Sequence, residues 1–302
     1  MNGRTPIMLV ARRISPFSPV RHSLFGVFIL LSAGVGADTL VLKDGRAVAG
    51  KTFVRQDNAI FLTVGPDGEA VTEPVGIPIT EIAKVDCDVP AVLGAAPPLL
   101  AVGKFSKALE EVEPALKTAE TYVDVPGCRW PELFVLKAHI LLAMGKDADA
   151  AAMASTMRKT KTPNLVCNSR TILSLIAARK GDHGEAASLL EEALIDENSG
   201  PSATAAASVV RGLCLLEKKQ YPEALKAFLE LPVFLPDETA LSGIALLGTA
   251  RAYYGMEDFD RSISVLESLI KTRPETPEIT TAETLLPEWK RRRRVIEEAK
   301  EP

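Results

Sequence analysis

The chain has 302 residues, of which 47% are hydrophobic and 25% charged, and its formal net charge is −4. This balance favours a packed, folded body and excludes a chain that stays disordered throughout. Because the first 37 residues contain four arginines and no acidic residue, the rest of the chain carries a net charge of −8. That acidic body argues against general binding of nucleic acid, which needs basic surface to neutralise phosphates.

The N-terminal segment is typical of an export signal. Arginines precede an apolar run from Leu24 to Leu31, and the small residues Val35 and Ala37 suit cleavage directly after Ala37. The alternative is an uncleaved membrane anchor. Even when extended to Ala37 the apolar stretch has only 14 residues, fewer than the roughly 20 that span a bilayer as a helix. We therefore expect residues 1–37 to be a signal peptide and the mature protein to be periplasmic or secreted.

Residues 38–89 follow with a pattern of short strands separated by tight turns. Asp44-Gly45 and Asp67-Gly68 are turn sequences, and Gly50 marks a place where a strand bends sharply. Five short strands in about 50 residues predict a small, strongly bent five-stranded β-barrel.

The order of these strands resembles the SH3-like and Sm-like small barrels. The segments that carry the resemblance are 42–46, which holds the Asp-Gly turn, Gly50, and 79–85, which closes the module. Sm-like proteins bind RNA, but this module lacks a dense basic surface. A structural or peptide-docking module is therefore the favoured interpretation.

Small residues recur at regular spacing beyond the proline-containing segment 90–98, which marks a linker or the boundary of a first helix. In the predicted second helix of each unit the small residues are Ala108, Ala150, Ala186, Ala224 and Ser262. Twelve residues before the last four of these stand Ala138, Ser174, Gly212 and Ala250. A small residue on both helices of a pair lets the two helices cross closely, so the pattern indicates packing rather than catalysis.

The turn between the two predicted helices also recurs. Its five versions are Gly103-Lys104-Phe105, Gly145-Lys146-Asp147, Gly181-Asp182-His183, Lys219-Gln220-Tyr221 and Glu257-Asp258-Phe259. Glycine ends a helix by adopting positive φ. An aromatic residue covers the turn in three of the five units, and Pro236 and Pro274 close the last two units. The second unit fits least well, because Asp147 replaces the aromatic residue.

These small, aromatic and proline positions resemble the tetratricopeptide repeat family. The resemblance covers residues 90–276 and implies a right-handed superhelix of about five helix pairs, in which residues 277–302 form a C-terminal capping helix. The spacing of 36 to 42 residues exceeds the usual repeat of about 34, so longer loops are expected. An ordinary bundle of paired helices is the alternative.

In this family the first helix of each pair lines a concave groove. Carried over from the small first-helix positions, the resemblance places six groove residues: His139, Leu175, Leu213, Leu216, Arg251 and Tyr254. A mostly apolar groove with a few polar side chains suits a peptide or an amphipathic helix.

The C-terminal helix contains one strongly basic run, Lys290-Arg291-Arg292-Arg293-Arg294. Arg293 and Arg294 stand four residues before Glu297 and Glu298, so pairing along a solvated helix is the first interpretation. The second is contact with an anionic surface, such as lipid headgroups or an acidic partner.

No catalytic, metal or cofactor motif is found in the chain. Only His139 and His183 remain after residue 37, and His183 stands at a turn position that packing explains. The four cysteines show no CxxC spacing, and a disulfide between Cys128 and Cys167, in adjacent repeats, is one option.

The sequence therefore predicts an exported, non-enzymatic scaffold or adaptor that needs no cofactor. Its partner is expected to be a protein or peptide held in the repeat groove, and nucleic acid is not expected. The alternative is an accessory factor that binds the cell envelope, either cell wall or anionic membrane, through the barrel or the basic C-terminal helix.

Overall fold

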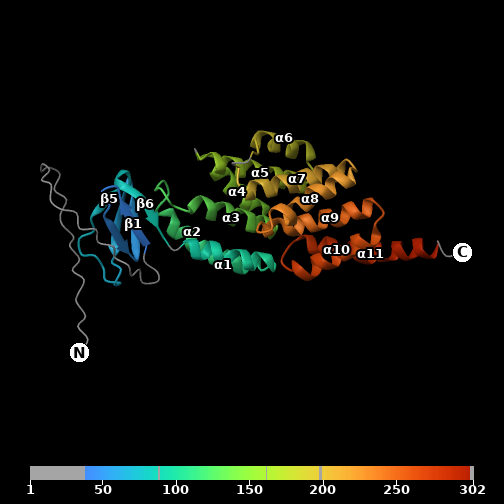
Figure 1. Ribbon diagram of the computed structural model, residues 1–302, viewed down its shortest axis with the longest axis horizontal. Coiled ribbons are helices and arrows are strands. Elements are labelled where there is room, and N and C mark those ends of the chain that lie inside the picture. Colours follow the sequence, from blue (N-terminus) through green and yellow to red (C-terminus); the bar gives the residue numbers. More distant parts are fainter. Residues whose placement is uncertain (1–37, 88, 161, 197–198, 300–302) are drawn as a thin grey trace, which may run out of the picture. The chain divides into compact units, whose positions relative to one another are not determined.

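The computed structural model describes residues 38–87, 89–160, 162–196 and 199–299, so the predicted signal peptide lies outside the described part. Six strands come first within that part, and eleven helices follow them (Figure 1). This order confirms the expected mainly helical fold class, with a small β module in front of the helices.

The β module differs from the predicted closed barrel. Its strands are β1 (Asp38–Leu42), β2 (Ala47–Gly50), β3 (Thr52–Gln56), β4 (Ala59–Val64), β5 (Gly76–Pro78) and β6 (Ile82–Asp86), with a 3₁₀ turn η1 (Ile79–Glu81) before the last. They form two antiparallel sheets of three strands, in the orders β2-β1-β6 and β3-β4-β5. The prediction of one five-stranded barrel was wrong because the chain changes sheet between β2 and β3.

Gly50 is the residue at which this change of sheet occurs. It pairs with Asp38 at the end of the first sheet, while Thr52 already pairs with Val64 in the second. A Cβ atom on Gly50 would lie 2.0 Å from a methyl group of Leu62, so only glycine lets the backbone pass this close to β4. The sharp bend predicted at Gly50 is therefore present.

The β module packs against the loop that follows the second helix. The Tyr122 hydroxyl donates a hydrogen bond of 2.6 Å to the Asp38 carboxylate, and the ring of Tyr122 meets Phe53 edge to face at 6.1 Å. The Val85 amide donates to the Pro126 carbonyl at 2.9 Å. These contacts join the two parts of the chain into one continuous apolar core.

The helices form five consecutive pairs and a final single helix. Their bounds are α1 (Val89–Ala101), α2 (Phe105–Glu120), α3 (Trp130–Ala143), α4 (Asp147–Arg158), α5 (Pro163–Arg179), α6 (His183–Ala193), α7 (Pro201–Glu217), α8 (Tyr221–Phe234), α9 (Ser242–Gly255), α10 (Phe259–Thr272) and α11 (Glu278–Glu298), with a 3₁₀ turn η2 (Thr239–Leu241) before α9. The five pairs confirm the predicted repeat body, and α1 includes the proline-containing segment 90–98.

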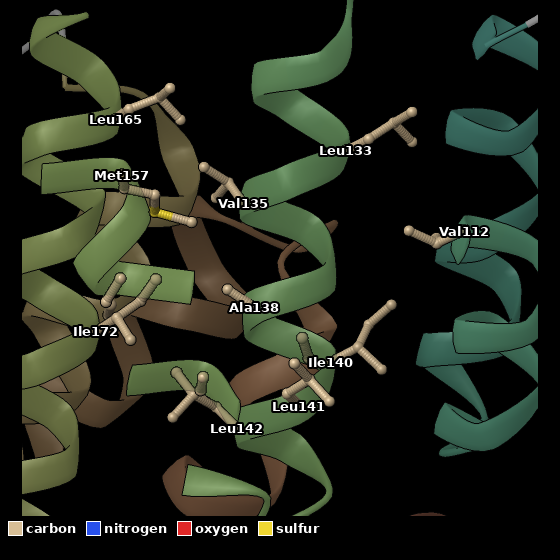
Figure 2. Close-up of a cluster of buried hydrophobic side chains, with 14 of the residues drawn as sticks. Val112, Leu133, Val135, Ala138, Ile140, Leu141, Leu142, Met157, Leu165 and Ile172 are labelled. Carbon is tan, nitrogen blue, oxygen red and sulfur yellow. The ribbon is translucent and has the colours of Figure 1, made fainter. Parts of the chain in front are cut away.

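The recurring small residues lie where helices of a pair cross. All nine are buried: Ala108, Ala138, Ala150, Ser174, Ala186, Gly212, Ala224, Ala250 and Ser262. Figure 2 shows the larger side chains around one of them, with Val112 of α2 on one side of α3 and Met157 and Ile172 on the other. Because α3 is covered on two sides, it is apolar around most of its circumference.

The turn inside each helix pair has the same backbone conformation in all five pairs. Gly103, Gly145 and Gly181 have positive φ, as predicted for glycines that end helices. In the last two pairs Lys219 and Glu257 adopt the same left-handed conformation with φ of 57° and 62°. The shared geometry outweighs the local cost of a side chain at positive φ.

A short segment between α10 and α11, residues 273–277, reaches back to the first helix pair. We call it the α10–α11 strap. Arg273 donates a hydrogen bond of 2.6 Å to the carbonyl of Ala101 at the end of α1, and the Glu275 carboxylate accepts one of 2.6 Å from the Ser106 amide at the start of α2. Repeats in an open solenoid contact only their neighbours, so the strap distinguishes this array from a simple superhelix.

Candidate functional site

A cavity of about 580 Å³ lies among the last three helix pairs and the start of α11. Its lining comes from the α5–α6 turn, the C-terminal end of α7, the first residue of α8, the middle of α9 and the first turn of α11. The lining residues are Ala178, Arg179, Gly181, His183, Leu213, Leu216, Glu217, Tyr221, Ile244, Leu247, Gly248, Arg251, Pro277, Glu278 and Thr281.

Three of the six predicted groove residues line this cavity. Leu213 and Leu216 are half-buried on α7, and Arg251 is exposed on α9. Leu247 and Ile244, one and two turns before Arg251, extend the apolar wall. Arg251 forms no ion pair within the described part of the chain. The protein around the guanidinium removes part of its hydration and so lowers its pKa, while the negative charge of Glu278 acts in the opposite direction.

Two residues of the recurring turns, His183 and Tyr221, also line the cavity. The sequence had suggested only a packing role for them. His183 opens α6, and its Nε2 lies 3.8 Å from a carboxylate oxygen of Glu217. Its Nδ1 is buried and has no hydrogen-bond partner among the residues that the structure describes. Tyr221 opens α8 at the equivalent position in the next pair. The recurring turn could have predicted that His183 and Tyr221 lie close together, because residues at equivalent turn positions of stacked pairs lie at the same edge of the array.

An ion-pair cluster forms one wall of the cavity. Arg179 at the end of α5 contacts Asp147 of α4 at 2.9 Å and Glu278 of α11 at 3.2 Å. It also donates a hydrogen bond of 2.8 Å to the Leu142 carbonyl, and Thr276 of the strap donates to Glu278. The side chains of Arg179 and Glu278 are only 15% and 8% exposed. Because both side chains are largely removed from water, the loss of either one would leave the other as an uncompensated buried charge.

The predicted groove positions His139 and Leu175 lie elsewhere, and the placement of their side chains on an open groove was wrong. Leu175 is fully buried within α5, and His139 is 1% exposed within α3. The position after the small residue faces the core in these two pairs because α3 and α5 are each covered by helices on several sides.

His139 is expected to make the folded protein less stable in acid. Burial lowers its pKa from 6.5 to about 4, so the folded state holds the imidazole neutral while the unfolded state takes up a proton below pH 6.5. Above about pH 6.5 this contribution to stability is fully present. As the pH falls from 6.5 towards 4, the free energy of unfolding decreases by up to about 3 kcal/mol. Urea denaturation at a series of pH values checks this. His139→Leu is expected to remove this part of the pH dependence, and an unchanged profile in that variant contradicts the assignment.

Tyr254 is covered by the capping helix instead of lining the cavity. Its ring stacks on Trp289 of α11 with the centroids 4.3 Å apart, and its hydroxyl accepts a hydrogen bond of 3.0 Å from Arg292. The guanidinium of Arg292 also lies over the Tyr254 ring. The expected capping role of this helix is thus carried by an aromatic stack that occupies a predicted groove position.

Three of the five cations in the basic run contact other side chains of the chain. Lys290 pairs with Glu267 at 2.6 Å, Arg292 holds Tyr254, and Arg293 pairs with Asp260 at 2.8 Å and Glu297 at 2.9 Å. The predicted pairing of Arg293 with Glu297 is confirmed. Two cations of the run, Arg291 and Arg294, are exposed and have no ion pair among residues 38–299 that the structure describes.

The cysteines form no disulfide in the part of the chain that the structure describes. The bridge considered between Cys128 and Cys167 is not made, because the two residues belong to different apolar clusters. Cys128 packs against the main core, while Cys167 packs with Ala193 and Ala203 of α6 and α7.

Two further features are absent from the described residues. None of their histidine, cysteine and acidic side chains gather in a group that could hold a metal ion. None of their helices combines the length and the apolar character that crossing a membrane requires.

Comparison with protein families gives two matches, each to a model described as tetratricopeptide repeat. The first covers residues 173–238, from α5 to the end of α8, and the second covers residues 244–276, with α9 and α10. No curated protein matches the chain. The helix pairs that line the cavity are therefore similar to tetratricopeptide repeats, and repeat arrays of this kind form extended concave surfaces.

Proposed function

We propose that the chain is an exported, non-enzymatic adaptor that holds a segment of another protein in the cavity among α5, α7, α9 and α11. The matched repeats support a protein-binding scaffold. The cavity supports the more specific part, because it is built by these repeats and combines an apolar wall with charged and hydrogen-bonding side chains.

Arg251 is the observation that carries the proposal. It stands beside the apolar wall of Leu213, Leu216 and Leu247 and has no ion pair among the described residues. An arginine in a partly dehydrated site gains most from a carboxylate or carbonyl group of a ligand, because such bonds are charge-assisted. Apolar side chains of the partner would cover the leucines, and an acidic or carbonyl group would meet Arg251.

The dimensions of the site favour a short, non-helical segment over a whole amphipathic helix. A volume of about 580 Å³ lies within the usual range for ligand pockets and accommodates a few side chains. Tyr254, which would extend the groove along α9, is stacked under Trp289. Pro277 of the strap and Glu278 of α11 form part of the lining and bound the cavity on their side.

Export is supported by the N-terminal sequence, in which arginines precede an apolar run that ends in small residues. Strand β1 starts at Asp38, the residue that follows the predicted cleavage site. The Asp38 carboxylate accepts the hydrogen bond from Tyr122, so this residue belongs to the fold. Cleavage after Ala37 would leave every described strand and helix intact.

A photo-crosslinking amino acid placed at position 251 tests both parts of the proposal in living cells. We expect it to trap a protein partner, and the trapped chain to begin at Asp38 and to be recovered outside the cytoplasm. With the partner in hand, Arg251→Ala is expected to weaken binding about tenfold or more in calorimetry.

The matched control is the same amino acid at position 291, since Arg291 is also an exposed arginine without an ion pair in the described part of the chain. Trapping at 251 but not at 291 supports the cavity as the site. Equal trapping at the two positions, or an affinity unchanged by Arg251→Ala, contradicts it.

A further inference from the structure

Cys87 comes directly after β6 and is buried in the same apolar cluster as Tyr122. Strands β1 and β6 are antiparallel, with Thr39 opposite Asp86, so the next step of the ladder brings Cys87 opposite Asp38. The Asp38 carboxylate accepts a hydrogen bond of 2.6 Å from the Tyr122 hydroxyl. The thiol of Cys87, which is buried, is thus held at the contact between the β module and the helices.

Cys128 approaches the same tyrosine from the loop after α2. The Val85 amide donates to the Pro126 carbonyl at 2.9 Å, which joins β6 to the segment that leads to Cys128, and Cys128 packs against the apolar cluster that contains Cys87. The Cys128 thiol lies 3.5 Å from the Ala119 carbonyl, one helical turn before Tyr122. Cys87 follows Val85 by two residues, and Cys128 follows Pro126 by two residues, so each of the two joined segments carries a cysteine close to the junction.

The pKa values of Tyr122 and Cys128 are consistent with Cys87 lying near both. Negative charge on Cys87 raises the pKa of Cys128, and charge on either cysteine raises the pKa of Tyr122. Interactions between charged groups weaken as the distance between them grows. Cys167 and Cys214 lie in other places, against α6–α7 and near the His183 carbonyl.

We infer that Cys87 and Cys128 form a redox pair, whose oxidation to a disulfide fastens the β module to the helical repeats. The reaction is thiol–disulfide exchange with a disulfide oxidant, such as oxidised glutathione or an oxidised dithiol protein. This inference concerns a different place from the cavity and does not depend on the proposed function.

The order of steps follows from exposure. Cys128 is half-buried and Cys87 is buried, so the Cys128 thiolate attacks the oxidant first and displaces one of its sulfurs as a thiol. Cys87 then loses its proton and attacks the sulfur of Cys128, displacing the second thiol. The two cysteines give up two electrons and two protons, and the oxidant disulfide becomes two thiols.

The rate of this exchange is expected to rise with pH. Burial is the largest cause that raises the pKa of Cys128, which reaches about 11. Only a small fraction of Cys128 is therefore thiolate near pH 7, and the fraction grows roughly tenfold for each pH unit below 11. The bridge closes a loop of 41 residues between the two parts of the chain, which favours the folded state.

The test treats the folded mature chain with oxidised glutathione at pH 8, blocks remaining thiols and identifies linked tryptic peptides by mass spectrometry. We expect peptide 85–104 to be joined to peptide 118–129, and oxidation to raise the melting temperature by about 5 °C or more. A chain with both Cys167→Ser and Cys214→Ser is the control, and it should keep both the linked peptides and the shift.

The peptide assignment uses the unaltered protein, so it does not depend on a variant that folds poorly. The inference is overturned if Cys87 and Cys128 remain separately alkylated after oxidation, or if either cysteine instead joins peptide 162–170 or 212–218. It is also overturned if the pair forms only after the chain has been unfolded in denaturant.

Discussion

Replacing Phe228 with alanine is expected to lower the free energy of unfolding by about 3–5 kcal/mol. Phe228 is 1% exposed on α8, and its ring lies in a slot between two glycines of neighbouring first helices. A Cβ atom on Gly212 of α7 would approach the ring to 2.6 Å, and one on Gly248 of α9 to 2.3 Å. Alanine would leave this slot empty, and rigid helix backbones on both sides limit how far it can close.

The exposed residue Phe234 at the end of the same helix provides the matched control. It is 75% exposed, so Phe234→Ala should change stability by less than about 0.5 kcal/mol. Chemical denaturation of the two variants in parallel makes the comparison. Similar losses for both would show that the Phe228 ring does not anchor the fourth and fifth helix pairs.

Enlarging a glycine beside the Phe228 ring provides an independent check, because it adds volume where Phe228→Ala removes it. Gly248→Ala adds a methyl group that would lie 2.3 Å from the Phe228 ring, so it should destabilise by about 1–3 kcal/mol through overpacking. Combined with Phe228→Leu, the same change should cost less than the sum of the two single changes, because the smaller side chain makes room for the methyl group. If the losses of stability from the two changes add strictly, the interpretation that the Phe228 ring fills a slot beside Gly248 is wrong.

The repeat body could be predicted because its signals are local. A small residue such as Ala150 or Ala224 and a turn a few residues away define each pair, and the structure buries the small residues and keeps the turn. The second pair fits the pattern least well, because Asp147 stands where an aromatic residue is expected. The structure gives the reason: Asp147 pairs with Arg179 of the next helix pair.

Other features could not be predicted because they depend on contacts distant in the sequence. The strap brings Glu275 to Ser106, 169 residues away, and no short motif encodes that meeting. The groove positions were inferred from a uniform register along the first helices, which holds for Leu213 and Arg251. It fails for His139, because α3 is enclosed by neighbours that its own sequence does not specify.

Replacing Arg179 with methionine is the second change expected to have a large effect, again about 3–5 kcal/mol. Arg179 is the cation that Asp147 and Glu278 share, at 2.9 and 3.2 Å, and its side chain is 15% exposed. Methionine keeps most of the apolar stem but removes the charge and the bond to the Leu142 carbonyl. Glu278 would then be a carboxylate that is 8% exposed and has lost its ion pair.

The loss should reflect unpaired charge instead of lost packing, and a triple variant separates the two causes. Adding Asp147→Asn and Glu278→Gln to Arg179→Met removes the orphaned charges, so most of the lost stability should return. The control is Arg129→Met, which breaks the exposed pair with Glu132 and should cost about 0–1 kcal/mol. If the triple variant is no more stable than Arg179→Met alone, the cluster acts through side-chain volume. If Arg179→Met itself costs no more than Arg129→Met, α11 is held to the earlier helix pairs by the strap, without a contribution from this ion-pair cluster.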